Sequence, residues 1–330
     1  MLFRSLDKAW CVAQVLSFLG AASAEETALF QRYRTSQFVP ATRRLTEELW
    51  QKSIIHSRED RHVGAIFAST LMALAGSSAQ PASAFGLDAN GRTDLERDTR
   101  LPARVVKYVS GVLALEPSPM VWIQETGDGL RVANTIGMGA DQKKLVPSLL
   151  VGAPQVTKTD ERELAFEVGK RLAYLRPERF ASLAMGSLPK LEAAFAAAVL
   201  AGGHRVIDHE GNPFDAKTDD ARKMAATLRQ AVPSQLLEQV GEISSKLSGR
   251  VGNGLITGWR TGTDLTANRV GFIVCNDFET ASRGIATEGA AMSTLSVKER
   301  LRDLLAYAVS DSYFTVRRHL GIHVRDEASA

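Results

Sequence analysis

The sequence is poor in the features that mark several large classes of protein. It has 2 cysteines and 7% aromatic residues in 330 residues. The two cysteines, Cys11 and Cys275, lie far apart in apolar surroundings, so we expect buried, reduced thiols and not a disulfide framework. No apolar run approaches the roughly 18 residues that a membrane-spanning helix needs. A membrane span is therefore not expected.

The sequence also lacks a large excess of charge of either sign. The net charge is +3 and acidic and basic residues are interspersed, so no basic block is present that could neutralise a nucleic-acid backbone. Nucleic acid is therefore not an expected partner. Hydrophobic residues at 45% and charged residues at 23% are typical of a soluble globular protein, and we expect a cytoplasmic one.

The first residues leave a second localisation open. Arg4 and Lys8 precede an apolar run that ends in small residues, so the stretch Met1–Ala24 resembles a signal peptide and would predict export. Asp7 and Gln14 interrupt that pattern, and an ordinary helix explains them better.

The first 76 residues predict a helical segment. Small residues at Ala9 and Ala13 in the stretch Leu6–Leu16 resemble the second helix of a tetratricopeptide repeat. Further helices are predicted over 24–34, over 40–54 and, after a Ser57 cap, up to residue 76. Residues 77–100 are rich in Ser, Ala, Gly, Pro and Asp and predict a linker loop. We therefore expect three parts: 1–76, 77–100 and a domain over 101–330.

The third part combines a small sheet with helices. A helix over 103–113 precedes strands predicted at 120–124, 130–136 and 145–151, and Pro147 suggests that the last is an edge or bulged strand. Six further helices are predicted at 188–202, 217–231, 233–248, 254–275, 277–287 and 296–320. The expected fold class is α+β, mainly helical, with a three-stranded sheet.

The stretch Glu163–Leu175 between sheet and helices predicts an amphipathic helix, capped by Thr159 or Asp160. One face carries an apolar stripe of Leu164, Val168, Leu172 and Leu175. Another face carries Glu163, Glu167, Arg171 and Tyr174. This helix is the centre of the functional reasoning.

Two stretches carry a family resemblance. The first is Glu163–Tyr174, which opens Glu-Leu, and the second is Asp264–Gly271, which reads Asp-Leu-Thr-Ala-Asn-Arg-Val-Gly. They resemble the patterns E-L-x-A-V-x-A-H-E-x-x-H and E-x-x-A-D-x-x-G of the HtpX-like gluzincin metallopeptidases. The chain from about residue 103 to its end is similar to such a domain in degenerate form, as in the C-terminal part of myxobacterial tetratricopeptide-repeat proteins. The resemblance implies a zinc-peptidase fold preceded by a repeat remnant.

The resemblance also implies that the catalytic groups have been replaced. Lys170 and Tyr174 stand where the family has its two zinc-binding His, and Arg171 stands where it has its general base. In the second pattern Asp264 replaces the third ligand, Asn268 replaces an Asp, and Gly271 is retained. Catalytic zinc needs three ligands with lone pairs, and Lys and Arg are cations without one. We therefore expect a pseudoenzyme site with no catalytic residue, metal or cofactor.

Two interpretations of the polar face remain open. A Lys170 or Arg171 cation could pair with Asp264 and cross-link the two helices as zinc would. Alternatively, the face is simply solvated, with Glu167 pairing Arg171 four residues on.

Other histidines give weaker signals. His204, Asp208 and His209 lie in a polar loop and could form a non-standard metal site, although a surface loop explains them as well. His56 and His62 predict surface or capping roles. His319 and His323 form a separate pair that is predicted to interact with the C-terminus of a helix that ends at Gly321.

The leading hypothesis is a non-catalytic protein-interaction or scaffold protein with unidentified protein partners. One alternative is a metallohydrolase that uses His204, Asp208 and His209. Another is that the chain is the truncated C-terminal piece of a longer repeat protein.

Overall fold

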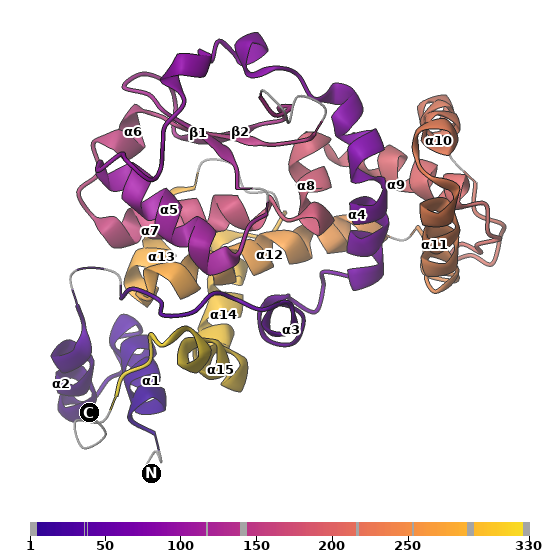
Figure 1. Cartoon of the computed structure of the whole chain (residues 1–330). Helices are drawn as coiled ribbons and strands as arrows, with labels where there is room; N and C mark the ends of the chain where they lie inside the picture. The colour runs from indigo at the N-terminus through magenta and orange to yellow at the C-terminus, as the bar shows by residue number, and fades with distance from the viewer. Residues whose placement is uncertain are drawn as a thin grey trace.

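The structure is a computed structural model. It describes residues 5–325 except 36, 38, 117, 139–143, 216–217, 253 and 289–293, and the side chain of Ser77 is also outside the description. Within these ranges the chain is mainly helical with one small mixed sheet, which confirms the expected fold class (Figure 1). The helices, in chain order, are α1 (Leu6–Phe18), α2 (Ala24–Tyr33), α3 (Glu47–Leu49), α4 (Arg61–Leu74), α5 (Leu101–Leu113), α6 (Ala153–Val156), α7 (Glu161–Ala173), α8 (Pro177–Ala184), α9 (Leu188–Gly202), α10 (Asp219–Ala231), α11 (Ser234–Ser245), α12 (Leu255–Cys275), α13 (Phe278–Thr287), α14 (Val297–Ala308) and α15 (Asp311–Leu320).

The sheet has the strand order β1-β3-β2, formed by β1 (Met120–Ile123), β2 (Leu130–Ala133) and β3 (Ser148–Val151). Strand β3 is central, parallel to β1 and antiparallel to β2, so the prediction of an edge or bulged third strand is wrong. Pro147 is tolerated because it precedes the first paired residue, and its carbonyl oxygen accepts the N–H of Met120 at 3.1 Å.

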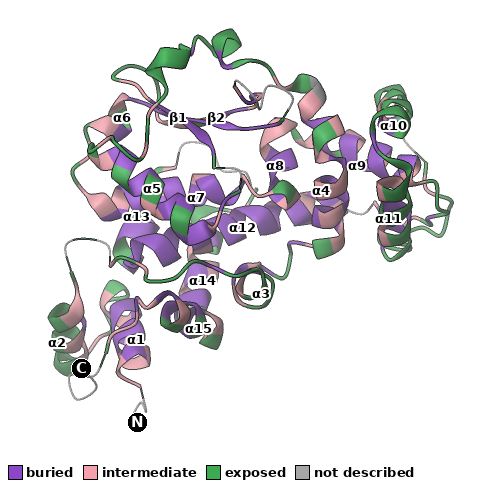
Figure 2. Ribbon diagram, in the orientation of Figure 1, coloured by how far each residue is buried: buried purple, intermediate pink, exposed green. Residues whose placement is uncertain are grey.

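Helices α5 and α7 cover one face of the sheet, and α12 and α13 lie beyond them (Figure 1). Figure 2 shows that α7, α12 and α13 are largely buried. Their apolar side chains belong to the largest hydrophobic cluster of the chain, together with Val121 and Leu149 from the sheet. Helix α7 is therefore the central element of the main body.

The opposite face of the sheet is covered by residues 77–100, which the sequence predicts to be a linker. They include the short 3₁₀-helices Gly76–Ser78, Ala82–Phe85 and Ala89–Gly91. Ala82 and Leu87 pack against Met120 and Trp122, and the Trp122 indole N–H donates to the carbonyl oxygen of Asp88 at 2.9 Å. The segment is thus packed onto the sheet.

Helices α1 and α2 form a hairpin that packs at the far end of the main body, next to α15 (Figure 1). The two polar residues that interrupt the signal-peptide pattern have partners there. The carboxylate of Asp7 accepts from the Arg317 guanidinium of α15 at 2.7 Å, and both side chains are buried. The Gln14 side-chain oxygen accepts the backbone N–H of Phe278. The largest hydrophobic cluster runs from Trp10 to Ile322, across the predicted division at 77–100.

Several predicted boundaries are wrong because side chains cap the helices elsewhere. Helix α3 starts at a Thr46 cap instead of at Pro40, and a five-residue π-helix, Trp50–Ile54, continues it. Asp60, and not Ser57, caps α4. The predicted helix 296–320 is two helices, because the Ser310 hydroxyl accepts the N–H of Tyr313 and starts α15.

Helices α10 and α11 form an arm that projects sideways from α9 (Figures 1 and 2). Their inner residues, such as Ala225 and Val240, are buried against a second hydrophobic cluster with α4 and α9. Their outer faces are exposed and polar. In the part of the chain that the structure describes, no helix is both long enough and apolar enough to cross a bilayer.

Candidate functional site between helices α7 and α12

Helix α7 begins at Asp160, one of the two predicted caps, whose carboxylate accepts the N–H groups of Arg162 and Glu163. Leu164, Val168 and Leu172 are buried, as the predicted stripe requires. Tyr174 belongs to the core and not to a solvated face, because only 1% of its surface is exposed. The side chains of Lys170 and Tyr174 near the C-terminus of α7 are therefore buried in the protein, whereas Arg171 is half-buried.

Helices α7 and α12 approach each other so closely that two glycines are needed. A Cβ atom placed on Gly169 would clash with Val274 and lie 3.2 Å from the Gly271 Cα atom. A Cβ atom on Gly271 would lie 2.8 Å from the backbone oxygen of Phe166. The glycine that the family pattern retains, Gly271, thus allows close helix packing here.

A buried ion pair links the two helices at this contact. The Lys170 ammonium lies 3.1 Å from Asp264 Oδ1, and the Tyr174 hydroxyl donates to the same oxygen at 3.0 Å. The Asp264 side chain is completely buried and that of Lys170 is 9% exposed. Of the two open interpretations, the Lys170–Asp264 pair is present.

Two further charges complete the cluster, and sequence reasoning missed both. The Lys170 ammonium also lies 2.6 Å from Glu288 Oε2, at the end of α13, and Arg300 of α14 binds the same oxygen at 2.5 Å. Two cations, Lys170 and Arg300, therefore balance two carboxylates, Asp264 and Glu288. We call these four residues and Tyr174 the α7–α12 ion cluster.

Some polar atoms of the site are left without partners. Asp264 Oδ2 and both side-chain amide atoms of Asn268 are buried and form no hydrogen bond with the described residues. Burial raises the pKa of the Tyr174 hydroxyl well above its ordinary value, and the negative charge of Asp264 adds to the effect. Tyr174 is therefore a neutral donor, not a phenolate.

Arg171 is not a member of the ion cluster, although its charge acts on the Tyr174 hydroxyl. Among the described residues it forms no ion pair with Asp264, and Glu167 binds Lys158 at 3.3 Å and Gln155 at 3.1 Å instead of Arg171. The alternative interpretation, a solvated face with Glu167 paired to Arg171, is thus not found, because the Glu167 carboxylate binds Lys158 and Gln155.

The residues at this contact do not fit a catalytic zinc ion. Zinc needs three donors with free lone pairs. Here a cation occupies the Asp264 oxygen, the Tyr174 hydroxyl is a donor to that oxygen, and Lys170 offers no lone pair. The chemistry that this arrangement supplies is a cross-link between α7, α12, α13 and α14.

The alternative metal site is not assembled. His204 Nδ1 lies 3.3 Å from the Ser245 hydroxyl. The Asp208 carboxylate accepts the backbone N–H groups of Glu210 and Asn212, and these hydrogen bonds lower the pKa of Asp208. His209 lies beside Gly252. Across the ranges that the structure describes, no three His, Cys, Asp or Glu side chains are grouped so that they could hold a metal ion.

Three of the remaining histidines have structural partners, whereas the buried Nδ1 atom of His323 forms no hydrogen bond with the described residues. His56 is buried, not at the surface: its Nε2 atom lies 3.0 Å from Asp303 and its Nδ1 atom accepts the N–H of Arg58. His62 lies at the start of α4 next to its cap, as predicted. His319 Nε2 lies 3.0 Å from the carbonyl oxygen of Arg44, and Gly321 ends α15 in a left-handed conformation.

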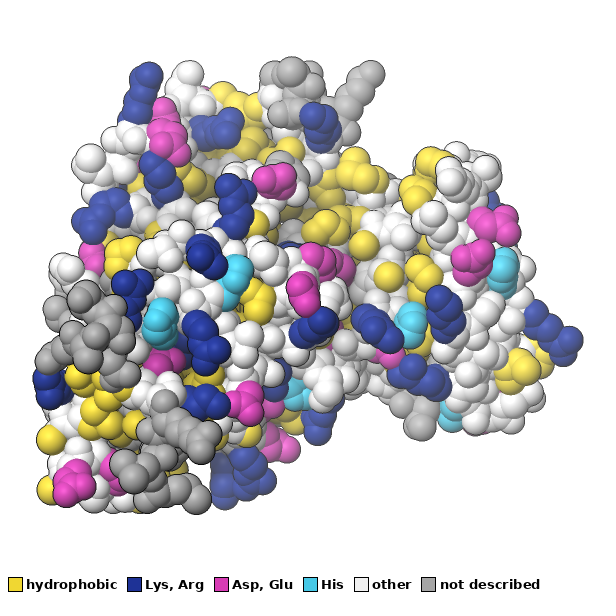
Figure 3. Space-filling model, turned by 60° about the horizontal axis from the view of Figure 1, so that its bottom comes forward, with side chains coloured by type: hydrophobic (Ala, Val, Ile, Leu, Met, Phe, Trp, Pro, Cys, Tyr) yellow, Lys and Arg dark blue, Asp and Glu magenta, His cyan; other side chains and the backbone are white. Residues whose placement is uncertain are grey.

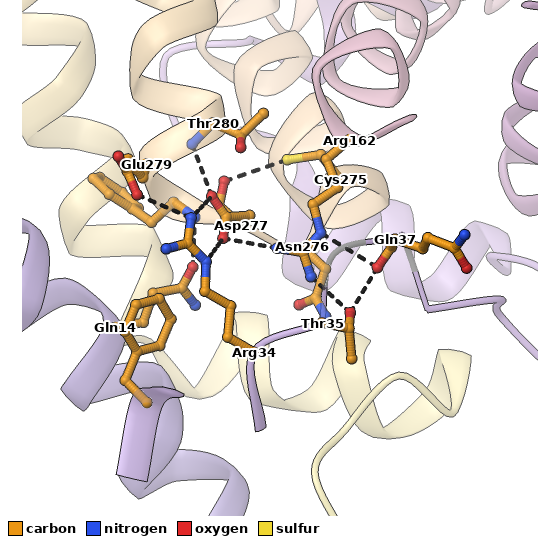
Figure 4. A network of polar contacts seen from close by, with 12 residues as sticks. Gln14, Arg34, Thr35, Gln37, Arg162, Cys275, Asn276, Asp277, Glu279 and Thr280 are labelled. Carbon is orange, nitrogen blue, oxygen red and sulfur yellow. Dashed lines mark hydrogen bonds and ion pairs between the residues drawn. The ribbon is translucent and has the colours of Figure 1, made fainter. Parts of the chain in front are cut away.

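A second buried network joins the N-terminal hairpin to α7 and α13 (Figure 4). Asp277 caps α13 through the N–H of Thr280, and its Oδ2 atom lies 2.9 Å from Arg162 and 3.1 Å from Arg34. Arg162 also donates to the Thr35 hydroxyl at 2.8 Å. An Asp before a helix is a typical cap, so the sequence is consistent with the capping role of Asp277. Its partners Arg34 and Arg162 are distant in the sequence, which does not indicate these contacts.

Both cysteines are free and buried, as predicted. Burial raises the pKa of the Cys11 thiol to about 12 and also raises that of Cys275. Neither thiol is a nucleophile at neutral pH.

Comparison with protein-family models, with curated proteins and with solved structures finds no match to this chain. The resemblance to HtpX-like metallopeptidases therefore remains a prediction from two short stretches of sequence.

Proposed function

We propose that this chain is a non-catalytic protein-interaction or scaffold protein, built on an inactivated zinc-peptidase fold. The observation that carries the proposal is the α7–α12 ion cluster. Lys170 lies against Asp264 and Glu288 at the position where the resemblance would place the metal. The residues at the positions of a peptidase's metal ligands are bound to one another in this cluster, so the role that we propose for them is structural.

The catalytic part of the proposal is tested with the purified full chain. We expect substoichiometric zinc by mass spectrometry and no cleavage of unfolded casein, with or without added zinc. Cleavage that disappears in the Asp264→Asn variant, while that variant stays folded, would overturn the proposal.

The resemblance itself has a separate test. A variant with Lys170→His, Arg171→Glu, Tyr174→His and Asp264→Glu carries the family's ligand set, and the Arg171→Glu variant alone is its control. Stoichiometric zinc binding by the fourfold variant, and not by the control, would support the resemblance. A folded fourfold variant without zinc would contradict the resemblance but leave the non-catalytic proposal standing.

The interaction part is supported by the arm of α10 and α11, whose exposed polar faces project from the main body. Affinity purification with the tagged full chain is the measurement. A partner that is retained by the Lys298→Glu variant but lost when Lys223→Glu and Glu238→Lys alter the arm would support an arm-mediated interface. Equal recovery by both variants would contradict it.

A further inference from the structure

His56 belongs to the turn that leads from the N-terminal segment into α4. The turn spans residues 56–59 and is closed by the Glu59 N–H, which donates to the His56 carbonyl oxygen at 2.8 Å. The His56 backbone N–H donates to the Thr266 hydroxyl of α12 at 2.9 Å. A Cβ atom on Gly262 would lie 2.6 Å from the Glu59 Cα atom, so the turn rests directly on α12. The turn is therefore closely packed against the main body.

The turn positions two carboxylates that anchor neighbouring helices. The buried Glu59 carboxylate accepts from the Arg179 guanidinium of α8 at 2.6 Å and from the Thr266 hydroxyl of α12 at 2.6 Å. The Asp60 carboxylate, directly after the turn, caps α4 by accepting its first N–H groups. A movement of the turn would thus act on the contacts of α4 with α8 and α12.

Both ring nitrogens of the buried His56 side chain have partners, and these partners define one tautomer. The Nδ1 atom accepts the backbone N–H of Arg58 at 3.0 Å, so this nitrogen carries no proton. The Nε2 atom lies 3.0 Å from Asp303 Oδ1 of α14 and is the nitrogen that donates. The imidazole in this arrangement is therefore neutral, with its single proton on Nε2.

The charged groups around this ring come from α12, from α14 and from the turn itself. Asp303 of α14 faces the Nε2 atom, and Arg269 of α12 binds the same carboxylate at 3.0 Å. Burial acts to raise the pKa of Asp303, but the hydrogen bond from His56 and the charge of Arg269 lower it overall. The turn adds the Glu59 carboxylate, which two donors bind, and the exposed Arg58 guanidinium. Asp303 therefore stays ionised at pH 5 and remains bound to Nε2.

We propose that His56 is an acid-sensitive switch: uptake of a second proton at its Nδ1 atom releases the Arg58 N–H and loosens the turn at the start of α4. An imidazolium has two N–H donors and no acceptor, so the contact with Arg58 is incompatible with protonation. Because Asp303 binds the other nitrogen, the ring stays in place and the turn moves. The switch is independent of the proposed scaffold function, because it uses none of the ion-cluster residues.

The test is hydrogen exchange of the full chain, measured by mass spectrometry at pH 7.5 and at pH 5. These values lie on either side of about pH 6.5, where histidine takes up its second proton in peptides. Protection factors, which correct for the intrinsic pH dependence of exchange, are compared for the peptide that contains Arg58 and Glu59. Protection should fall about fivefold at pH 5, the fold-change that corresponds to one hydrogen bond. A peptide from the buried centre of α12 is the internal reference and should stay protected.

Two variants assign the response to one imidazole. Figure 3 shows several histidine side chains among those of Lys and Arg on one face of the protein, and these histidines titrate as well. In the His56→Asn variant the Asn side chain can accept the N–H two residues later but does not titrate, so its turn should be equally protected at both pH values. The matched control is His62→Asn, which removes the imidazole beside the Asp60 carboxylate and should keep the pH response of the wild type.

Nitrogen NMR of the full chain with labelled histidine gives a measurement that needs no variant. The Nδ1 atom of His56 should be unprotonated at pH 7.5 and protonated at pH 5, and the pH of this change should coincide with the loss of protection in the turn. Equal protection of the wild-type turn at both pH values would overturn the proposal. A pH response that persists in His56→Asn, or that disappears in His62→Asn, would overturn it as well.

Discussion

The α7–α12 ion cluster makes a quantitative prediction for the Lys170→Met variant. Methionine keeps most of the volume of lysine and removes the cation, which leaves the completely buried Asp264 carboxylate without a counter-charge. Removing one partner of a buried ion pair costs about 3–5 kcal/mol. The Tyr174 hydroxyl still donates to Asp264, and Arg300 still balances Glu288. We therefore expect a loss at the lower end, about 3 kcal/mol of the free energy of unfolding.

The assay is urea unfolding of the full chain, monitored by tryptophan fluorescence and circular dichroism. The matched control is Lys298→Met, which removes an exposed lysine from α14 and should change the free energy of unfolding by less than about 0.5 kcal/mol. A double variant, Lys170→Met with Asp264→Asn, keeps an acceptor for Tyr174 but removes the unpaired charge. It should recover about 2 kcal/mol relative to the sum of the single variants.

Two results would refute the reasoning. One is a Lys170→Met variant no less stable than the Lys298→Met control. The other is strict additivity of the two single changes, which would mean that Lys170 and Asp264 do not interact.

Three further outcomes are expected. Tyr174→Phe should lower the free energy of unfolding by about 1–2 kcal/mol in the same urea assay, because a buried carboxylate on α12 loses a donor. Gly169→Ala should lower the free energy of unfolding by about 1–3 kcal/mol, because the new methyl group would clash with a valine on α12. Its control, Gly111→Ala in the open part of α5, should leave the free energy of unfolding unchanged or raise it by up to about 1 kcal/mol. Equal effects of the two changes would contradict the packing argument. Cys11 and Cys275 should not react with a thiol reagent at pH 8 in the native protein and should both react in urea, because burial shields both thiols and raises their pKa values further above that pH, which suppresses the thiolate; rapid native reaction would contradict this.

Local patterns in the sequence predict α7 and α12 well. The apolar spacing in Glu163–Leu175 and the Asp160 cap are properties of neighbouring residues, and the structure has both. The same logic placed the helices from α9 to α13 within a few residues of their bounds. The predicted Ser57 cap of α4 is wrong, because the Asp60 carboxylate three residues later accepts the first N–H groups of the helix.

The sequence does not reveal most contacts between residues that lie far apart along the chain. The central place of β3 depends on which strands meet in space, and Pro147 alone cannot reveal it. Glu288 lies 118 residues from Lys170, and nothing near Lys170 in the sequence points to it. The Lys170–Asp264 pair is one of two interpretations of the sequence, and it depends on the family resemblance, which implies that the two helix faces lie opposite each other. The sequence predicts a surface or capping role for His56, because its partner, Asp303, belongs to a helix much later in the chain.

The pair between Asp7 and Arg317 has a consequence for synthesis on the ribosome. The two residues are separated by 310 positions, and both become buried only when α1 and α15 meet. Helix α1 is translated before its partner, and α15 follows only after the intervening residues have been made. During that time α1 can pack only on α2, where Trp10 contacts Phe30, and the side of α1 that later meets α13, α14 and α15 is open to chaperones or to aggregation. The arrival of α15 therefore sets the moment at which the Asp7 side of α1 can fold into place.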